Sequence, residues 1–263
     1  MIVFAAIVPT SPLLFASINP QGLPLLEKTR TALAELAQDL AAHEPDTIVI
    51  FSEQVTMYDN AFSINVADPY IADLEDFGDL GYRKSYHPDF ALVDNLQRNL
   101  RTVGEPISLT TDARLTHTTG VPLDFLTKHL PRVRILPIAP SKLDAKAHFA
   151  FGVALRNVLL ASSSRIAVIA AGDTAHALNA DSPTPAHPDG KAFDRTLIEL
   201  LENNNVVGLL GIDDALRDNA KESVYRQTLM LIGALKDTNV TPIVRSYEAP
   251  LGVGHLVVEF DIE

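Results

Sequence analysis

The chain has 263 residues, of which 47% are hydrophobic, so it can bury a sizeable core in one large α/β domain or two small ones. Its formal net charge of −12 argues against nucleic acid as a partner, because phosphate binding requires clustered lysine and arginine. The absence of cysteine excludes disulfides, thiolate nucleophiles and cysteine-ligated zinc. No apolar run approaches the ~20 residues that span a bilayer and no secretory leader pattern is present, so we expect a cytoplasmic protein that contacts no membrane.

The first fifty residues predict a βαβ unit. Apolar runs over Ile2 to Val8 and Thr47 to Phe51 are typical of strands that are buried on both faces. Residues 25–40, between them, carry leucine at helical spacing. Strand, helix and strand within about 50 residues predict a right-handed crossover with parallel strands. Residues 55–89 are irregular and acidic, and predict a long excursion with short strands that covers a site.

The rest of the chain alternates helical and strand patterns. Helical spacing predicts helices over residues 90–103, 121–130, 142–161, 191–202, 212–218 and 222–235. Buried strands are predicted at 134–138 and 166–171, a Pro-rich loop at 181–189, and two antiparallel strands at 242–248 and 252–260. We therefore expect an α/β protein: a single three-layer α/β/α domain over residues 1–263, with a mixed, largely parallel central sheet.

The strand predicted at 166–171 ends abruptly in Gly172-Asp173-Thr174-Ala175-His176. Ligands in open α/β sheets bind beside the carboxyl ends of the strands. Asp173 and His176 therefore stand where such proteins carry out their chemistry. A turn that only ends the strand is the structural alternative, because Gly-Asp pairs do this routinely.

Other polar residues converge on the same edge by this argument. Thr10, Gln54 and Glu248 follow or end predicted strands, while His117 and Glu222 stand near the starts of predicted helices. Each also has a structural explanation, such as a cap for Thr10 or a favourable helix dipole for Glu222. Taken together, their placement predicts a site. None of the motifs G-x-S-x-G, H-E-x-x-H, G-x-G-x-x-G or the P-loop accompanies them.

Seven segments, in this order, resemble the class III extradiol ring-cleavage dioxygenase superfamily, the LigB-like proteins. They are Pro9 to Leu14, Ser52 to Phe62, His117 to Leu123, Gly172 to Leu178, Gly190 to Asp194, Glu222 to Arg226 and Gly252 to Val257. The likeness spans nearly the whole chain. It is greatest to the small LigB-like, Memo-like proteins of the AmmeMemoRadiSam group, in which a cysteine often stands at the position of Ser223.

The resemblance implies a site with two departures. Active members hold Fe(II) with two histidines and a glutamate, beside an acid/base histidine. His176 matches the acid/base histidine, His117 a second pocket histidine, and Glu222 the third ligand. The two ligand histidines are replaced by Thr10 and Gln54, and a hydroxyl and an amide are poor substitutes for imidazoles around Fe(II).

Three hypotheses follow from this comparison. The first is a protein that has lost its iron site. It binds a small aromatic ligand, assembles as a homo-oligomer, or acts as the iron-free companion of a catalytic partner subunit. The second is an enzyme acting on an aromatic or carbonyl substrate, with His176 as acid/base, oriented by Asp173, and His117 polarising an oxygen. In that enzyme Glu53 and Glu222 are weak candidates to hold Mg²⁺ or Mn²⁺. The third, a conventional Fe(II) dioxygenase, lacks a ligand set. No cofactor is expected under the first hypothesis.

Overall fold

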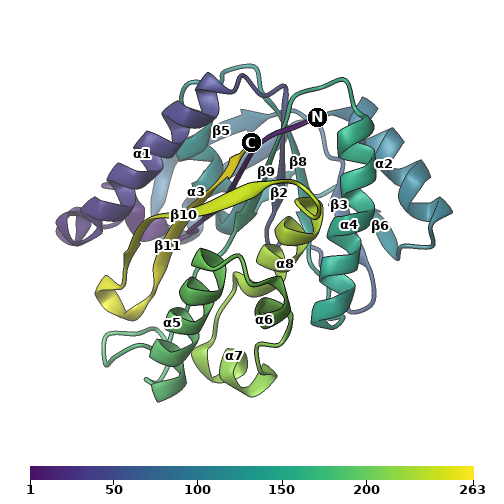
Figure 1. The fold of residues 1–263 in the computed structure, drawn as a ribbon. Coiled ribbons are helices and arrows are strands. Elements are labelled where there is room, and N and C mark those ends of the chain that lie inside the picture. Colours follow the sequence, from purple (N-terminus) through teal and green to yellow (C-terminus); the bar gives the residue numbers. More distant parts are fainter.

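An eight-stranded mixed sheet organises the computed structural model, which describes residues 1–263 (Figure 1). Its strands are β1 (Ile2–Val8), β2 (Thr47–Phe51), β3 (Phe62–Asn65), β6 (Ile107–Thr110), β8 (Arg134–Ala139), β9 (Ile166–Ala171), β10 (Val240–Glu248) and β11 (His255–Ile262). They lie in the order β10-β11-β1-β9-β2-β8-β3-β6. The four central strands β1, β9, β2 and β8 are parallel, whereas β11 runs antiparallel to both β1 and β10, and β3 antiparallel to β8. The predicted mixed sheet is confirmed.

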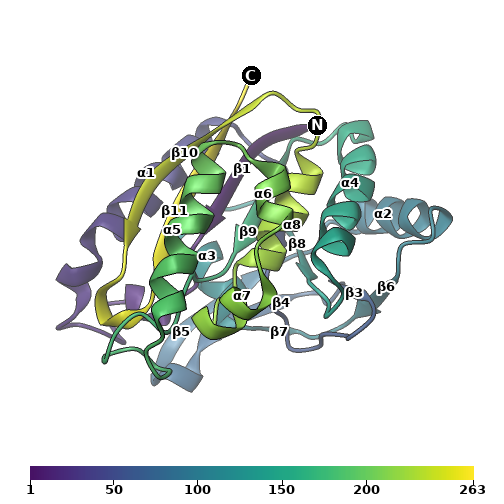
Figure 2. The ribbon, with the colours of Figure 1, turned by 60° about the horizontal axis from the view of Figure 1, so that its bottom comes forward.

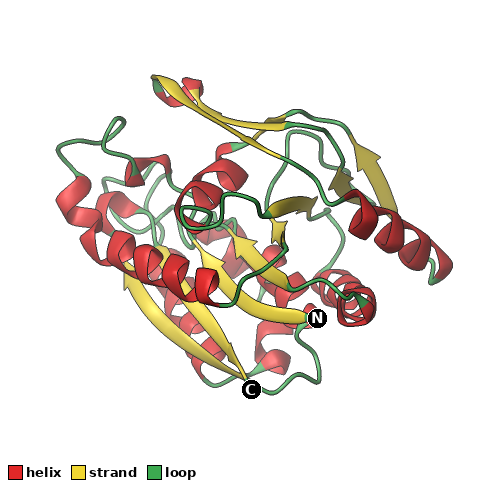
Figure 3. Cartoon of the chain, turned by 90° about the horizontal axis from the view of Figure 1, so that it is seen from above, coloured by secondary structure: helices red, strands yellow, loops and turns green.

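Helices cover both faces of this sheet, as Figure 3 shows from above. One face packs against α1 (Glu27–Ala42) and α3 (His117–Leu126). The other packs against α2 (Phe90–Thr102), α4 (Ala145–Ala161), α5 (Pro188–Glu202), α6 (Val206–Leu210), α7 (Asp214–Ala220) and α8 (Tyr225–Ala234). This is the predicted three-layer α/β/α arrangement. No helix combines the length and the hydropathy that a bilayer crossing requires.

Apart from Thr47 and Arg134, which begin β2 and β8, the central strands are apolar because each of their faces meets a helical layer. In β1, Ile7 packs into one core and Val8 into the other, and all seven residues of the strand are buried. The same holds for β2 and β9, whose residues are buried without exception. Strands covered on both faces lose the alternation of polar and apolar residues that one-sided sheets show. For this reason the continuous apolar runs located these strands correctly from the sequence.

The irregular region after β2 does contain short strands, as expected. A separate three-stranded sheet is formed by β4 (Tyr70–Leu74), β5 (Asp79–Tyr86) and β7 (Arg114–Leu115), in the order β5-β4-β7. Short 3-10 turns complete the chain at Pro12–Leu14, Leu23–Leu26, Glu75–Phe77 and Pro250–Gly252. The helix predicted at residues 121–130 was placed wrongly, since α3 begins and ends four residues earlier. Thr116 and Thr118 each donate a hydroxyl hydrogen bond to the Glu53 carbonyl oxygen. These bonds anchor the first turn of α3, although its threonines locally favour a loop.

Candidate functional site

The turn after β9, residues 172–176, is fixed by neighbouring segments on both sides. Gly172 N donates to Val8 O at 3.0 Å, and Asp173 N donates to Ser223 Oγ at 3.1 Å. Ser223 N in turn donates to Asp173 O at 3.0 Å. A Cβ atom on Gly172 would lie 2.4 Å from Ser223 O, so glycine is needed for the segment before α8 to approach this closely.

Asp173 joins this turn to the end of β1. Its Oδ1 accepts from Thr10 N at 2.9 Å, and its Oδ2 accepts from Thr10 Oγ1 at 2.8 Å. Thr10 is only 1% exposed, and the Asp173 carboxylate is almost as deeply buried. A buried carboxylate needs donors to replace water, and a single threonine supplies two of them here. The structure therefore brings together two of the strand-end residues chosen from the sequence.

His176 is held at the same place with one ring nitrogen free. Its backbone N donates to Ala220 O at 2.9 Å, and its Nδ1 lies 2.8 Å from Lys221 O. A carbonyl oxygen only accepts, so Nδ1 carries the hydrogen of this bond. In the neutral ring Nε2 is then an acceptor, 4.0 Å from Asp173 Oδ2, and the side chain is 24% exposed. The imidazole is thus oriented and accessible, as a proton acceptor must be.

The end of β2 meets the start of α3. Gln54 Nε2 donates to Ser52 Oγ and to Thr119 Oγ1, both at 2.8 Å. The Gln54 side chain is therefore an internal brace of a buried polar cluster. Burial raises the pKa of the neighbouring Glu53, while the positive charges of Arg226 and His176 oppose that shift. Glu53 thus shares an electrostatic environment with His176.

His117 opens α3 beside this cluster. Its ring packs edge-on against Phe77, with the ring centroids 5.0 Å apart. Burial lowers the pKa of His117 below its ordinary value; the carboxylates of Asp173 and Asp76 oppose this, and the charge of His176 adds to it. His117 is therefore a largely neutral imidazole within electrostatic reach of Asp173 and His176.

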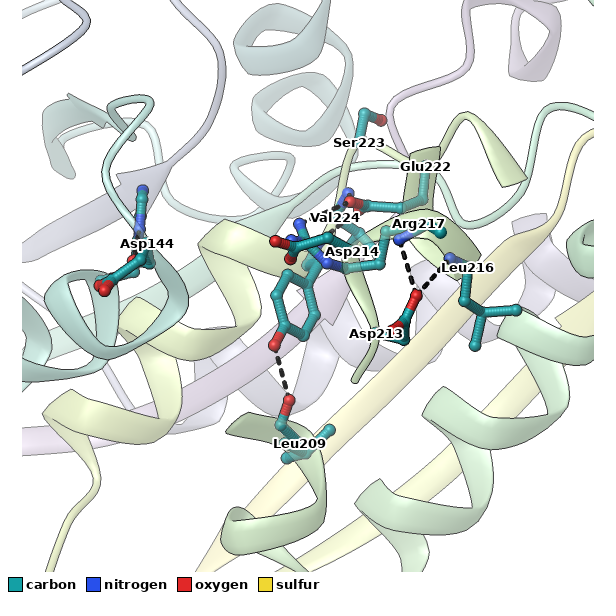
Figure 4. A network of polar contacts seen from close by, with 12 residues as sticks. Asp144, Leu209, Asp213, Asp214, Leu216, Arg217, Glu222, Ser223 and Val224 are labelled. Carbon is teal, nitrogen blue, oxygen red and sulfur yellow. Dashed lines mark hydrogen bonds and ion pairs between the residues drawn. The ribbon is translucent and has the colours of Figure 1, made fainter. Parts of the chain in front are cut away.

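Glu222 lies in the segment between α7 and α8, as Figure 4 shows. Its Oε2 accepts from Val224 N at 2.9 Å and from Tyr225 N at 2.7 Å, so it caps the start of α8. Its Oε1 lies 3.8 Å from Arg217 Nη1. Burial raises the pKa of Glu222, and these hydrogen bonds and the charge of Arg217 work against the shift. The carboxylate expected at the third ligand position thus has partners of its own.

Glu248, the remaining strand-end residue, does not join this group. Its Oε1 accepts from Thr29 N at 2.7 Å, in the first turn of α1. Asp194 was not predicted from the sequence as a site residue; it fixes the His176 turn from α5 by accepting from Ala175 N at 2.8 Å. The one signal for it was its place in the segment Gly190 to Asp194, and its burial in the middle of a helix has no local sequence signature.

Comparisons with known proteins address the family directly. Residues 5–258 match the family described as the catalytic LigB subunit of aromatic ring-opening dioxygenase. The chain belongs to this LigB family. The resemblance drawn from the seven segments is thereby confirmed at the level of the family.

This LigB-family chain is similar in sequence to one protein and in fold to another. Protein CA_C1420 of Clostridium acetobutylicum is 25% identical over 264 residues, which cover 97% of this chain and 56% of that protein. The chain therefore spans about half the length of this relative. The crystal structure of an uncharacterized Escherichia coli protein, JW3007, superposes with a TM-score of 0.66 at 16% identity, covering 98% of this chain and 99% of that one. At that identity the likeness supports the fold alone.

The residues of this LigB-family chain do not fit the Fe(II) centre that the family implies. Thr10 offers a hydroxyl that donates to Asp173, and Gln54 offers an amide whose Nε2 donates to Ser52 and Thr119. Nowhere in the structure do three or more histidine, aspartate or glutamate side chains converge in a way that could hold a metal ion. Iron(II) oxygenases use two imidazoles and a carboxylate on one face of the metal, and no such set converges at this edge of the sheet.

Proposed function

We propose that this LigB-family protein works without the ring-cleaving iron centre, as a binding subunit for a small aromatic ligand or as the iron-free companion of a catalytic partner subunit. The proposal rests on the hydrogen bonds of Thr10 and Gln54, which stand at the two positions where the resemblance implies ligand histidines. Thr10 donates to Asp173, and Gln54 braces Ser52 and Thr119, so both side chains are built into the frame of the site. A substitution that only deleted a ligand would leave a gap, whereas these two residues complete hydrogen-bond networks.

A second candidate is an enzyme that uses His176 as a general acid/base on an aromatic or carbonyl substrate. It is favoured by one observation, the Nδ1 bond to Lys221 O, which leaves Nε2 as the acceptor of a partly exposed ring. Asp173 then stabilises the imidazolium that forms on proton uptake, and His117 supplies a neutral imidazole to polarise a substrate oxygen. Under either role we propose that the chain lies near the Memo-like branch, on the order of the seven matching segments, although Ser223 stands where that branch often has a cysteine.

One comparison separates the two candidates. Catechols and aromatic carbonyl compounds are screened for binding and for turnover with the unmodified protein, His176→Ala and the exposed-histidine control His129→Ala. A binding subunit retains a ligand without converting it. An enzyme converts a compound, and His176→Ala lowers its turnover by roughly 10²–10⁴-fold while His129→Ala does not. Turnover that survives in His176→Ala would remove His176 from the mechanism.

A further inference from the structure

A groove lies between α5, the end of β10 and residues 178–179, which follow the His176 turn. Figures 1 and 2 show α5 beside β10 and β11. The groove has a volume of about 560 Å³, within the range of small-molecule pockets. Leu178, Ile198, Tyr247 and Ala249 make most of its exposed lining apolar. A ligand held here would bury an apolar body.

Charged side chains on α5 give the groove two different ends. Lys191 and Arg195 both line it, one turn apart on the same helix face, and neither forms an ion pair in the structure. Glu199 and Glu202 line it further along α5. Two unpaired cations favour one anionic group at the first end, while the glutamates repel a second anionic group at the other.

The floor of the groove connects with the candidate site. Tyr247 lines the groove, and its OH donates to Asp194 Oδ2 at 2.5 Å. The other oxygen of this carboxylate accepts from Ala175 N, the residue before His176. Asp194 is 2% exposed, and a Cβ atom on Gly254 would lie 2.5 Å from its Oδ2, so the carboxylate has little room to move independently of its partners.

We propose that this groove binds an amphipathic monocarboxylate. Its carboxylate contacts Lys191 and Arg195, and its apolar body packs against Ile198 and the Tyr247 ring. Occupancy reaches His176 through the hydrogen bonds that link Tyr247, Asp194 and Ala175. Ligand binding is inferred from the groove alone. Only an effect of that binding on activity rests on the function proposed for the His176 site.

The probe is 4-phenylbutyrate, compared with its neutral amide, in titrations of ¹⁵N-labelled protein. We expect saturable binding of the carboxylate, about tenfold tighter than that of the amide, because the charge-assisted contacts are lost with the amide. Amide signals of α5 shift together with those of Ala175 and His176. Equal affinity of the two compounds, or a linear response without saturation, would overturn the proposal.

Three variants and one control variant separate binding from coupling. Arg195→Gln weakens binding of the carboxylate about tenfold, whereas Arg101→Gln, an exposed control on α2, leaves it unchanged. Tyr247→Phe keeps the ring in the groove but loses the hydroxyl, so the probe binds and no longer shifts the signals of Ala175 and His176. Shifts that persist in Tyr247→Phe would disprove the coupling. His176→Ala binds the probe like the unmodified protein, so a failure of the proposed function leaves this test intact.

Discussion

The ends of β1 and β2 and the turn after β9 lie at the same edge of the sheet but differ in the side chains that they carry there. The turn after β9 keeps Asp173 and His176, with one ring nitrogen of His176 free. The ends of β1 and β2 carry Thr10 and Gln54, at the positions where the resemblance implies the two ligand histidines, and both side chains donate internal hydrogen bonds. Under the proposed function, the site has lost its metal ligands, while Thr10 still holds Asp173 in position through two hydrogen bonds.

The largest effect is expected where the turn after β9 meets the segment before α8. In Gly172→Ala the new Cβ atom would lie 2.4 Å from Ser223 O and 2.7 Å from Val224 Cα, and both atoms belong to backbone. We expect the free energy of unfolding to fall by about 3 kcal/mol, measured by urea denaturation. Gly81→Ala is the control, since its nearest neighbour would be 3.6 Å away. Equal stability of the two variants would mean that the turn is not constrained as described.

A smaller effect is expected at the link between the two regions. Thr10→Val keeps the shape of the side chain but removes the donor to Asp173 Oδ2, leaving that carboxylate with the Thr10 N bond alone. We expect a loss of about 1–2 kcal/mol in unfolding free energy, because the bond is buried and charge-assisted. A double-mutant cycle with Asp173→Asn measures the coupling between the two side chains. Strict additivity in that cycle would show that Thr10 does not depend on Asp173.

Much of the candidate site could be predicted from the sequence, and the reasons differ from residue to residue. Three residues, Thr10, Asp173 and His176, were predicted because parallel strands end at one edge of the sheet. Residues that follow such strands in the sequence therefore lie close together in space. Glu248 satisfies the same rule but caps α1, since the rule gives the edge and not the direction of the side chain. Asp194 was missed because its partners, Ala175 and Tyr247, come from a turn and a strand remote in sequence. The early start of α3 depends on tertiary bonds to the Glu53 carbonyl, which local propensity does not contain.

The smallest expected effect is a pH dependence of the free energy of unfolding that comes from His117. Burial lowers the pKa of His117 in the folded protein, so the unfolded chain binds its proton more readily. The contribution of neutral His117 to stability is therefore full above the unfolded value of about 6.5 and is lost as the pH falls below it. We expect the stability difference between the unmodified protein and His117→Asn to shrink between pH 7.5 and pH 5.5, measured by urea unfolding at both. His148 is shifted in the same direction but is present in both proteins, so the difference isolates His117. A difference that grows on acidification would contradict this assignment.

The measurement that tests the central claim most directly is the metal content of the unmodified protein. The protein is stripped with chelator, reconstituted anaerobically with Fe(II), Mn(II) and Zn(II) in parallel, desalted and examined by elemental analysis. Because Thr10 and Gln54 supply no imidazole and no three histidine, aspartate or glutamate side chains converge to hold a metal, the account predicts far less than one retained metal per chain in all three samples. About one tightly held iron per chain would contradict it, and would return this protein to the ring-cleaving chemistry of its family.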